Sequence, residues 1–263
     1  MSTESLTAGA RSGASAGVPA AIRAGVPAGV HSGVHAVGHR GDPYRFRENT
    51  LASIRSALEL GADAVEVDVR LTRDNVPVLL HDETLKRLWG HDRWLVDLTK
   101  ADVDELTGHG VPTLREAILA VGARRLMIDL RGAHDSAVRT VVGGVHEAGA
   151  SERTYYCGGP STMLRVRTAD PHAEIALSWA SCAPPRPELL AAITPRWLNY
   201  RFGLIDRALT ARAHRDGLLV AAWTPDTTRN MRQLLAAGVD AITTNRLDLL
   251  AKATTKYLNK KRS

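Results

Sequence analysis

Two polar clusters in the sequence have the residue types that acid–base and metal chemistry requires. The first begins with His39 and Arg40, in the stretch HRGDPYRFRENT. The second contains Glu66 and Asp68 in AVEVDV and, a short distance further on, His81 in VPVLLHD. Histidine exchanges protons near neutral pH, and hard cations such as Mg²⁺ or Ca²⁺ prefer carboxylate oxygens. The two clusters together predict a site that binds one divalent cation and moves protons.

The spacing of Glu66 and Asp68 matters if their segment is a strand. Residues two apart in a strand point to the same face, and two buried carboxylates are costly unless a cation or another partner offsets their charge. A third acid, Asp129 in RLMIDLRG, could complete a metal site, and Arg131 would face the same cavity. The alternative for the first two acids is that they face solvent or form salt bridges.

Short apolar segments alternate with helical patterns from residue 35 onward, which predicts repeated β–α units and a parallel sheet. The clearest helices are expected at 50–61, 113–122 and 228–238, each ending in Gly, and Asn49 or Thr50 is placed to cap the first of them. The strand-like segments are 35–38, 64–69, 76–81, 125–130, 153–157, 174–179, 197–200, 218–223 and 240–244.

The second and third strand-like segments are too close together to be parallel neighbours, which need a crossover of about a dozen residues or more. We therefore expect an antiparallel hairpin at the rim of the sheet, with Asp74 and Asn75 in its turn. If the turn is centred between these two residues, partners have numbers that sum to 149, and His81 lies opposite Asp68.

Without the returning arm of the hairpin, eight parallel strands remain. The predicted fold class is therefore α/β, as a closed (β/α)₈ barrel, with an open doubly wound sheet as the alternative. No GxGxxG or P-loop pattern supports a nucleotide-binding open sheet. Barrel active sites lie at the carboxyl ends of the strands, where His39 ends the first strand beside the acidic pair of the second.

The converging residues describe an in-line displacement at a phosphate ester. A metal ion and the guanidinium groups of Arg40 and Arg131 would bind the phosphoryl oxygens. One of His39 and His81 accepts a proton from the nucleophile, and the other protonates the leaving oxygen. The sequence does not decide which histidine has which role.

The composition is that of an ordinary globular protein, with 44% hydrophobic and 24% charged residues. The net charge of +6 favours anionic ligands, but the basic residues are scattered, so nucleic acid is not expected. The two cysteines fit no disulfide or metal pattern and no secretory signal is evident, so the cytoplasm is the expected compartment. No amphipathic membrane helix stands out, which leaves membrane association unsupported.

Three segments are expected along the chain. Residues 1–34 form a disordered tail rich in Ala, Gly and Ser, residues 35–255 form one barrel domain, and residues 256–263 form a basic tail. The oligomeric state is not determined by these features.

The ordered set of motifs resembles the glycerophosphodiester phosphodiesterase family, within the phosphatidylinositol-phosphodiesterase-like TIM-barrel superfamily. The resemblance extends over roughly residues 36–252 and implies a barrel, one divalent cation, and hydrolysis of glycerophosphodiesters to glycerol 3-phosphate and an alcohol. The matching pieces are His39-Arg40-Gly41, Glu48-Asn49-Thr50, Glu66-Val67-Asp68, the stretch HDETL from His81, VPTLREAI, Trp223-Thr224 and GVDAITTNR.

The resemblance also implies roles for individual residues. His39 and His81 correspond to the acid and the base, and Arg40 corresponds to a phosphate ligand. Glu66 and Asp68 correspond to metal ligands.

The chain departs from the family pattern at the third ligand, where Asp129-x-Arg131 replaces the usual Glu-x-Lys. The related sphingomyelinase D branch also has Asp there, so the alternative activity is cleavage or cyclisation of a lysophospholipid or sphingomyelin. A further alternative is a catalytically silent barrel that binds phosphate compounds or a partner protein. Glu48 is expected to orient a metal ligand or an arginine rather than to bind the metal.

The family often carries a small insertion over the site, here between His81 and Pro112. Trp89 and Trp94 in this segment are candidates for contact with the alcohol group or for packing against the barrel. Trp223 is a candidate for lining the cavity as part of the substrate site.

Overall fold

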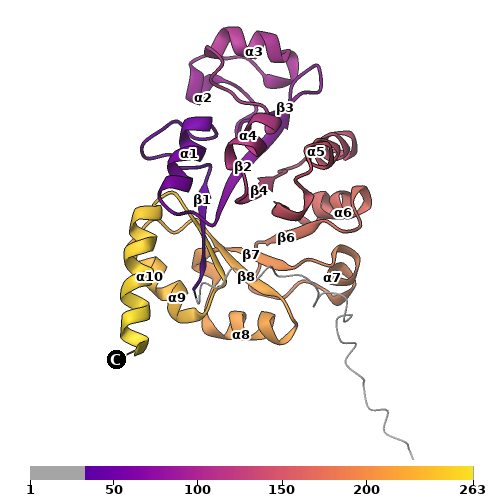
Figure 1. The fold of residues 1–263 in the computed structure, drawn as a ribbon. Helices are drawn as coiled ribbons and strands as arrows, with labels where there is room; N and C mark the ends of the chain where they lie inside the picture. The colour runs from indigo at the N-terminus through magenta and orange to yellow at the C-terminus, as the bar shows by residue number, and fades with distance from the viewer. Residues whose placement is uncertain (1–32, 263) are drawn as a thin grey trace, which may run out of the picture.

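Eight of the nine strands close into a parallel ring in the computed structural model, which describes residues 33–262 (Figure 1). The ring closes because β1 pairs with both β2 and β9. The predicted (β/α)₈ barrel is therefore confirmed, and the open sheet is excluded. The strands are β1 (His35–His39), β2 (Ala64–Leu71), β3 (Pro77–Leu79), β4 (Arg125–Asp129), β5 (Thr154–Gly158), β6 (Glu174–Trp179), β7 (Trp197–Arg201), β8 (Leu219–Trp223) and β9 (Ala241–Thr244).

The helices surround the ring and begin and end at residues of the expected kinds. Thr50 caps α1 by accepting a hydrogen bond from the Ser53 amide, and Thr113 forms a capping box with Glu116 at the start of α4. The helices are α1 (Leu51–Glu59), α2 (Lys86–Trp89), α3 (Lys100–Thr107), α4 (Leu114–Val121), α5 (Asp135–Glu147), α6 (Pro160–Ala169), α7 (Pro187–Ile193), α8 (Arg207–Arg215), α9 (Thr228–Ala237) and α10 (Leu247–Arg262).

The structure describes the two ends of the chain to different extents. The expected N-terminal tail, residues 1–34, lies almost entirely outside the described residues. The residues expected as a basic C-terminal tail continue helix α10 as far as Arg262. Among the described residues, no helix combines the length and the apolar character that a membrane crossing requires.

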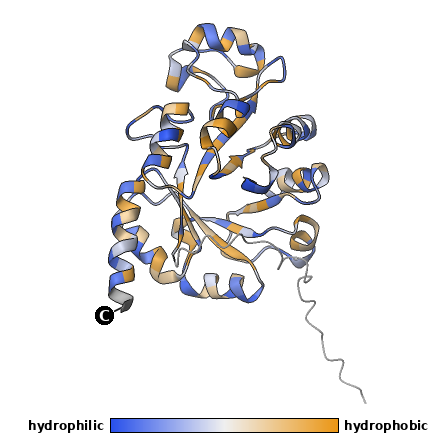
Figure 2. Cartoon of the chain, in the orientation of Figure 1, coloured by the Kyte–Doolittle hydropathy of each residue, from blue (hydrophilic) through white to orange (hydrophobic). Residues whose placement is uncertain are grey.

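The hydrophobic residues form one layer inside the ring and a second layer between the ring and the helices. Figure 2 shows hydrophobic residues along the strands and mixed hydrophobic and hydrophilic residues on the helices. In β2, Ala64 belongs to the inner layer, whereas Val65 and Val67 belong to the outer one. Because side chains alternate along a strand, Glu66 and Asp68 point into the barrel, as the spacing predicted.

Strands β2 and β3 form the predicted hairpin, but the predicted register is wrong by one residue. The loop has three residues rather than two, and Asn75 at its last position adopts a left-handed φ of 61°. Partners therefore have numbers that sum to 148. The amide of Leu80 donates to the carbonyl of Asp68 at 3.1 Å, so His81 lies one residue beyond the position opposite Asp68.

The segment between β3 and α4 is the expected insertion, and it contains α2 and α3 (Figure 1). It has a small hydrophobic core of its own, which includes Leu85 and Leu95. Trp89 packs beside Gly110, and the guanidinium of Arg47 lies 4.0 Å from the centroid of its ring. Trp94 is exposed. Trp89 therefore packs against Gly110 of the insertion and Arg47 of the loop that follows β1, and its contact with an alcohol group stays a prediction.

Candidate active site

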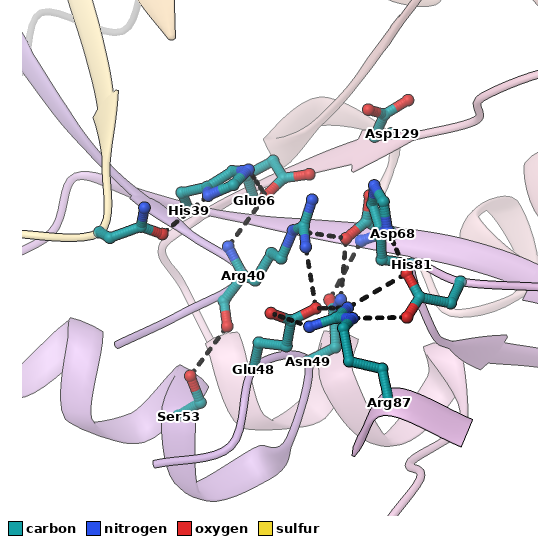
Figure 3. A network of polar contacts seen from close by, with 12 residues as sticks. His39, Arg40, Glu48, Asn49, Ser53, Glu66, Asp68, His81, Arg87 and Asp129 are labelled. Atoms are coloured by element: carbon teal, nitrogen blue, oxygen red, sulfur yellow. Dashed lines mark hydrogen bonds and ion pairs between the residues drawn. The ribbon is translucent and has the colours of Figure 1, made fainter. Parts of the chain in front are cut away.

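The candidate site lies at the carboxyl ends of β1, β2 and β4, which are neighbours in the ring (Figure 3). His39 is in register with Glu66, and Asp68 is in register with Asp129. The hairpin adds His81 to the group. Side chains that are separated by up to about 90 positions in the sequence are thus placed together by strand pairing.

Three carboxylates form a buried cluster that fits a hard cation. One oxygen each of Glu66, Asp68 and Asp129 lies within 4.8 Å of the others. Burial, reinforced by the charge of Asp68, raises the pKa of Asp129 to about 6. Burial, together with the charges of Asp68 and Asp129, also raises the pKa of Glu66 well above its usual range. Burial and like charge thus disfavour the ionised forms of Glu66 and Asp129, which a bound cation would reverse, and the oxygen-only donors match Mg²⁺ or Ca²⁺ rather than zinc.

Arg40 is held by contacts at both its backbone and its side chain. It adopts a φ of 58°, which is uncommon for a residue with a side chain. Its amide donates to Glu66 at 2.9 Å, and its carbonyl accepts from the Ser53 hydroxyl at 2.8 Å. Its Nη1 donates to Glu48 at 2.8 Å, and its Nε lies 3.1 Å from Asp68. These contacts fix the guanidinium beside the carboxylate cluster.

Asn49 holds Asp68 in place through two hydrogen bonds. Its Nδ2 donates to Asp68 Oδ2 at 2.8 Å, and its Oδ1 accepts from the Asp68 amide at 3.1 Å. Asn49 is therefore a support for the metal cluster, whereas the neighbouring Thr50 caps the helix.

His39 is oriented by Asn245, which is itself held by Asp226. The Asn245 amide nitrogen donates to Asp226 at 2.7 Å, so its oxygen faces His39 Nδ1 at 2.8 Å. An amide oxygen only accepts, so Nδ1 carries the proton. His39 Nε2 is then left as the acceptor, and it lies 4.0 Å from Glu66. Burial, with help from the charge of Arg40, lowers the pKa of His39, which favours the neutral ring.

His81 is oriented in a similar way by Asp82. The two side chains meet at 2.7 Å between Nδ1 and Oδ1. A hydrogen bond from Arg87, followed in size by the one from His81, lowers the pKa of Asp82 to about 2 against the effect of burial. Ionised Asp82 only accepts hydrogen bonds, so Nδ1 of His81 carries the proton.

The remaining predicted residues lie around this centre. Glu48 accepts a hydrogen bond from Arg40, and its orienting role stays a prediction. Arg131 is 63% exposed and lies 3.5 Å from Asp129. Trp223 is exposed at the end of β8. A cavity of about 400 Å³ opens at the site, and its lining contains neither Arg131 nor Trp223; it consists of His39, Arg40, Pro43, Tyr44, Glu48 and Asn245.

Sequence reasoning missed three polar residues that hold the site together. Arg87 contacts both Asp82 and Glu48, and Asn245, supported by Asp226, contacts His39. Asn245 directly follows the ninth strand-like segment, whose end must lie next to the first in a closed barrel. That position was a usable signal, whereas Arg87 lies in a segment without strand periodicity.

Comparisons with known proteins agree with this geometry. The sequence profile described as the Glycerophosphoryl diester phosphodiesterase family matches residues 39–249. A glycerophosphodiester phosphodiesterase of Caldanaerobacter subterraneus subsp. tengcongensis is 27% identical, over 80% of this chain and 93% of the relative. A probable glycerophosphodiester phosphodiesterase 2 of Mycobacterium tuberculosis is 29% identical, over 82% and 88% of the two chains.

Solved structures show the same fold. The structure of a putative glycerophosphoryl diester phosphodiesterase from Silicibacter pomeroyi superposes with a TM-score of 0.77 at 22% identity, covering 85% of this chain and 94% of that one. An Oleispira antarctica phosphodiesterase in complex with the product sn-glycerol-3-phosphate gives a TM-score of 0.75 at 20% identity, over 84% and 96% of the chains. With the family profile covering most of the sequence, the chain belongs to the glycerophosphoryl diester phosphodiesterase family.

Proposed function

We propose that the protein hydrolyses glycerophosphodiesters to glycerol 3-phosphate and an alcohol. The observation that carries this proposal is the placement of two oriented histidines, His39 and His81, with a fixed Arg40 and a buried carboxylate cluster. The names of the relatives and the product bound to the Oleispira antarctica enzyme support the same substrate class.

Each group has a task in this reaction. Glu66, Asp68 and Asp129 would hold one divalent cation, Mg²⁺ or Ca²⁺, which supplies positive charge to the phosphoryl oxygens when bound. Arg40 donates hydrogen bonds to the same phosphate. The lowered pKa of His39 supports it as the group that accepts a proton at Nε2 from the nucleophile. His81, when both of its ring nitrogens are protonated, would deliver the Nε2 proton to the leaving oxygen, while its Nδ1 proton stays on the hydrogen bond to Asp82.

A panel of glycerophosphodiesters, each assayed with Mg²⁺, Ca²⁺, Mn²⁺ and EDTA, tests the proposal. We expect release of glycerol 3-phosphate that stops in EDTA. His39→Ala and His81→Ala should each lower kcat by about 10²- to 10⁴-fold, because each removes one proton-transfer group, while the circular dichroism spectrum stays unchanged. Full activity in either variant would contradict the assigned chemistry.

A lysophospholipid is the second candidate substrate, with sphingomyelinase D-like or lysophospholipase D-like cleavage or cyclisation. Two observations favour it: the shorter acid Asp129 at the third ligand position, and the exposed aromatic ring of Tyr44, which lines the cavity. Choline release from glycerophosphocholine and from lysophosphatidylcholine, measured side by side, separates the two. Turnover of the lysolipid alone would replace the first proposal.

We propose the cytoplasm as the compartment on the basis of the cysteines. Cys157 and Cys182 are both free thiols, and Cys182 is exposed. Exposed free thiols persist in reducing compartments. Fractionation of cells followed by immunodetection tests this assignment, and recovery outside the cytoplasm would refute it.

A further inference from the structure

Arg87, from the short helix α2 of the insertion, makes paired contacts with two carboxylates of the site. Its Nε and Nη2 donate to the two oxygens of Asp82 at 2.6 and 3.2 Å. Its Nη1 and Nη2 donate to the two oxygens of Glu48 at 3.1 and 2.7 Å. The planar guanidinium thus binds both carboxylates with two hydrogen bonds each (Figure 3), which is a geometry that lysine cannot reproduce.

The two carboxylates belong to different halves of the site. Glu48 follows β1 and accepts a hydrogen bond from Arg40 at 2.8 Å. Asp82 follows β3 and pairs with His81 at 2.7 Å. The Arg87 guanidinium therefore connects Arg40, the proposed phosphate ligand, to His81, one of the two histidines proposed to transfer a proton. The segments that it joins belong to no common strand.

The contacts of Arg87 differ from those of an ordinary surface ion pair. Isolated exposed pairs contribute little, but the side chains of Glu48 and Asp82 retain only 13% and 25% of their exposure. Helix α2 is itself anchored, because Leu85 at its start is fully buried in the core of the insertion and Leu88 packs against that core. The position of Arg87 is thus set by hydrophobic packing and transmitted to the site by hydrogen bonds.

We propose that Arg87 is a positioning residue, through which the insertion sets the geometry of the His81–Asp82 pair relative to the Arg40–Glu48 pair. This inference rests on the proposed hydrolysis of phosphodiesters. Arg87 does not touch the reacting atoms: it holds Asp82 where its carboxylate keeps the Nδ1 proton of His81, and it shares Glu48 with Arg40.

Kinetics of Arg87→Ala and Arg87→Lys test the proposal, with Lys86→Ala as the control. Lys86 is the preceding residue of α2 and forms an exposed ion pair with Asp92, so its removal should leave kcat and KM unchanged. Arg87→Ala should lower kcat/KM by about 10²-fold, the effect of a misplacement of about 1 Å, with both a lower kcat and a higher KM. Arg87→Lys should lose nearly as much. Wild-type kinetics in Arg87→Ala, or full recovery with Lys, would overturn the proposal.

Two further measurements separate positioning from loss of the fold. Guanidinium ions at low millimolar concentration should raise the activity of Arg87→Ala to at least about a tenth of the wild-type activity. Equal concentrations of ammonium or urea should not, because guanidinium alone reproduces the fork of donors. If guanidinium fails to restore activity and the melting temperature has fallen, Arg87 is only structural.

Nitrogen-15 spectra of the histidine side chains provide a readout that does not depend on turnover. The signals of His81 are identified by their absence in His81→Gln. They should show a protonated Nδ1 in the wild type and a changed proton position in Arg87→Ala, whereas unchanged signals would refute the coupling. A wild type that hydrolyses no diester would contradict the proposed function alone, and the spectra would still decide the role of Arg87.

Discussion

Two asparagines orient the charged groups of the site. Asn49 holds Asp68 and Asn245 holds His39, each through a side-chain amide whose other contact defines which end donates. An amide presents a donor and an acceptor in fixed geometry, so it can set both the position and the proton of its partner. A search of the sequence for acidic and basic groups identifies Asp68 and His39 but does not identify the two asparagines that orient them.

Removal of the Asn245 amide should impair proton transfer at His39. In Asn245→Ala the ring loses the acceptor that keeps the proton on Nδ1, and a fraction of molecules then presents a protonated Nε2 to the substrate. We expect kcat to fall by at least about tenfold, given that acid–base groups contribute about 10²- to 10⁴-fold. Asn230→Ala on α9 is the matched control, and equal kcat values in the two variants would contradict the role of Asn245.

The contact between Arg87 and Asp82 should appear in the pH dependence of stability. The pKa of Asp82 is about 2 in the folded protein, below its ordinary value of 3.8. A depressed pKa stabilises the fold above the ordinary value, and the stabilisation disappears as the pH falls through about 4 to about 2. Urea unfolding of wild type and Arg87→Ala should therefore differ most near about pH 5, and the difference should shrink by about pH 2.5. The difference stays below about 1 kcal/mol because the pair is partly exposed. A difference that is constant across this range would show that the contact does not depress the pKa of Asp82.

In the β2–β3 hairpin, the conformation of a single turn residue decides the register of the two strands, which the pattern of apolar residues does not determine. The pattern of apolar residues predicts two antiparallel strands but is compatible with a loop of two or of three residues. Asn75 adopts the left-handed conformation that ends the three-residue loop, and that choice shifts the partner of every residue in β3 by one.

Substitution of Asn75 tests the turn. Asn75→Ala should lower the free energy of unfolding by about 1 kcal/mol, because residues with a β-carbon are disfavoured at positive φ and Asn tolerates it better than Ala. Asn75→Gly should be neutral or slightly stabilising, since glycine adopts this conformation freely. Urea unfolding of both variants provides the measurement, and a loss of stability in the glycine variant would point to a contact of the Asn75 side chain instead.

For the whole molecule, ring closure is the decisive feature. It places β1 between β2 and β9, so His39 meets both Glu66 and Asn245, which is 206 positions away. It also concentrates three carboxylates in one cluster, where burial and the neighbouring like charges raise the pKa of Glu66 and of Asp129.

A bound cation should therefore stabilise the whole fold. At a concentration of 100 Kd, Mg²⁺ or Ca²⁺ should add about 2.7 kcal/mol to the free energy of unfolding, which raises Tm by several degrees. Asp129→Asn should abolish this rise and leave the Tm in EDTA equal to or above that of the wild type, because it removes one of three repelling charges. Asp135→Asn, an exposed acid on α5, should behave as the wild type. A cation-dependent Tm shift that survives in Asp129→Asn would place the cation elsewhere.

The sequence by itself determined the barrel, the hairpin and the identity of the catalytic and metal-binding candidates. Strand periodicity sets which residues face inward, and the order of β–α units sets which strands are neighbours, so His39, Glu66, Asp68 and Asp129 converge without further information.

Only the tertiary structure decided the hairpin register, the exposure of Arg131 and the supporting contacts of Asn49, Arg87 and Asn245. These features depend on the φ of single loop residues and on side-chain hydrogen bonds between segments far apart in the chain. Neither leaves a periodic signal in the sequence, because such contacts are set by distances that exist only once the ring has closed and the insertion has packed above it.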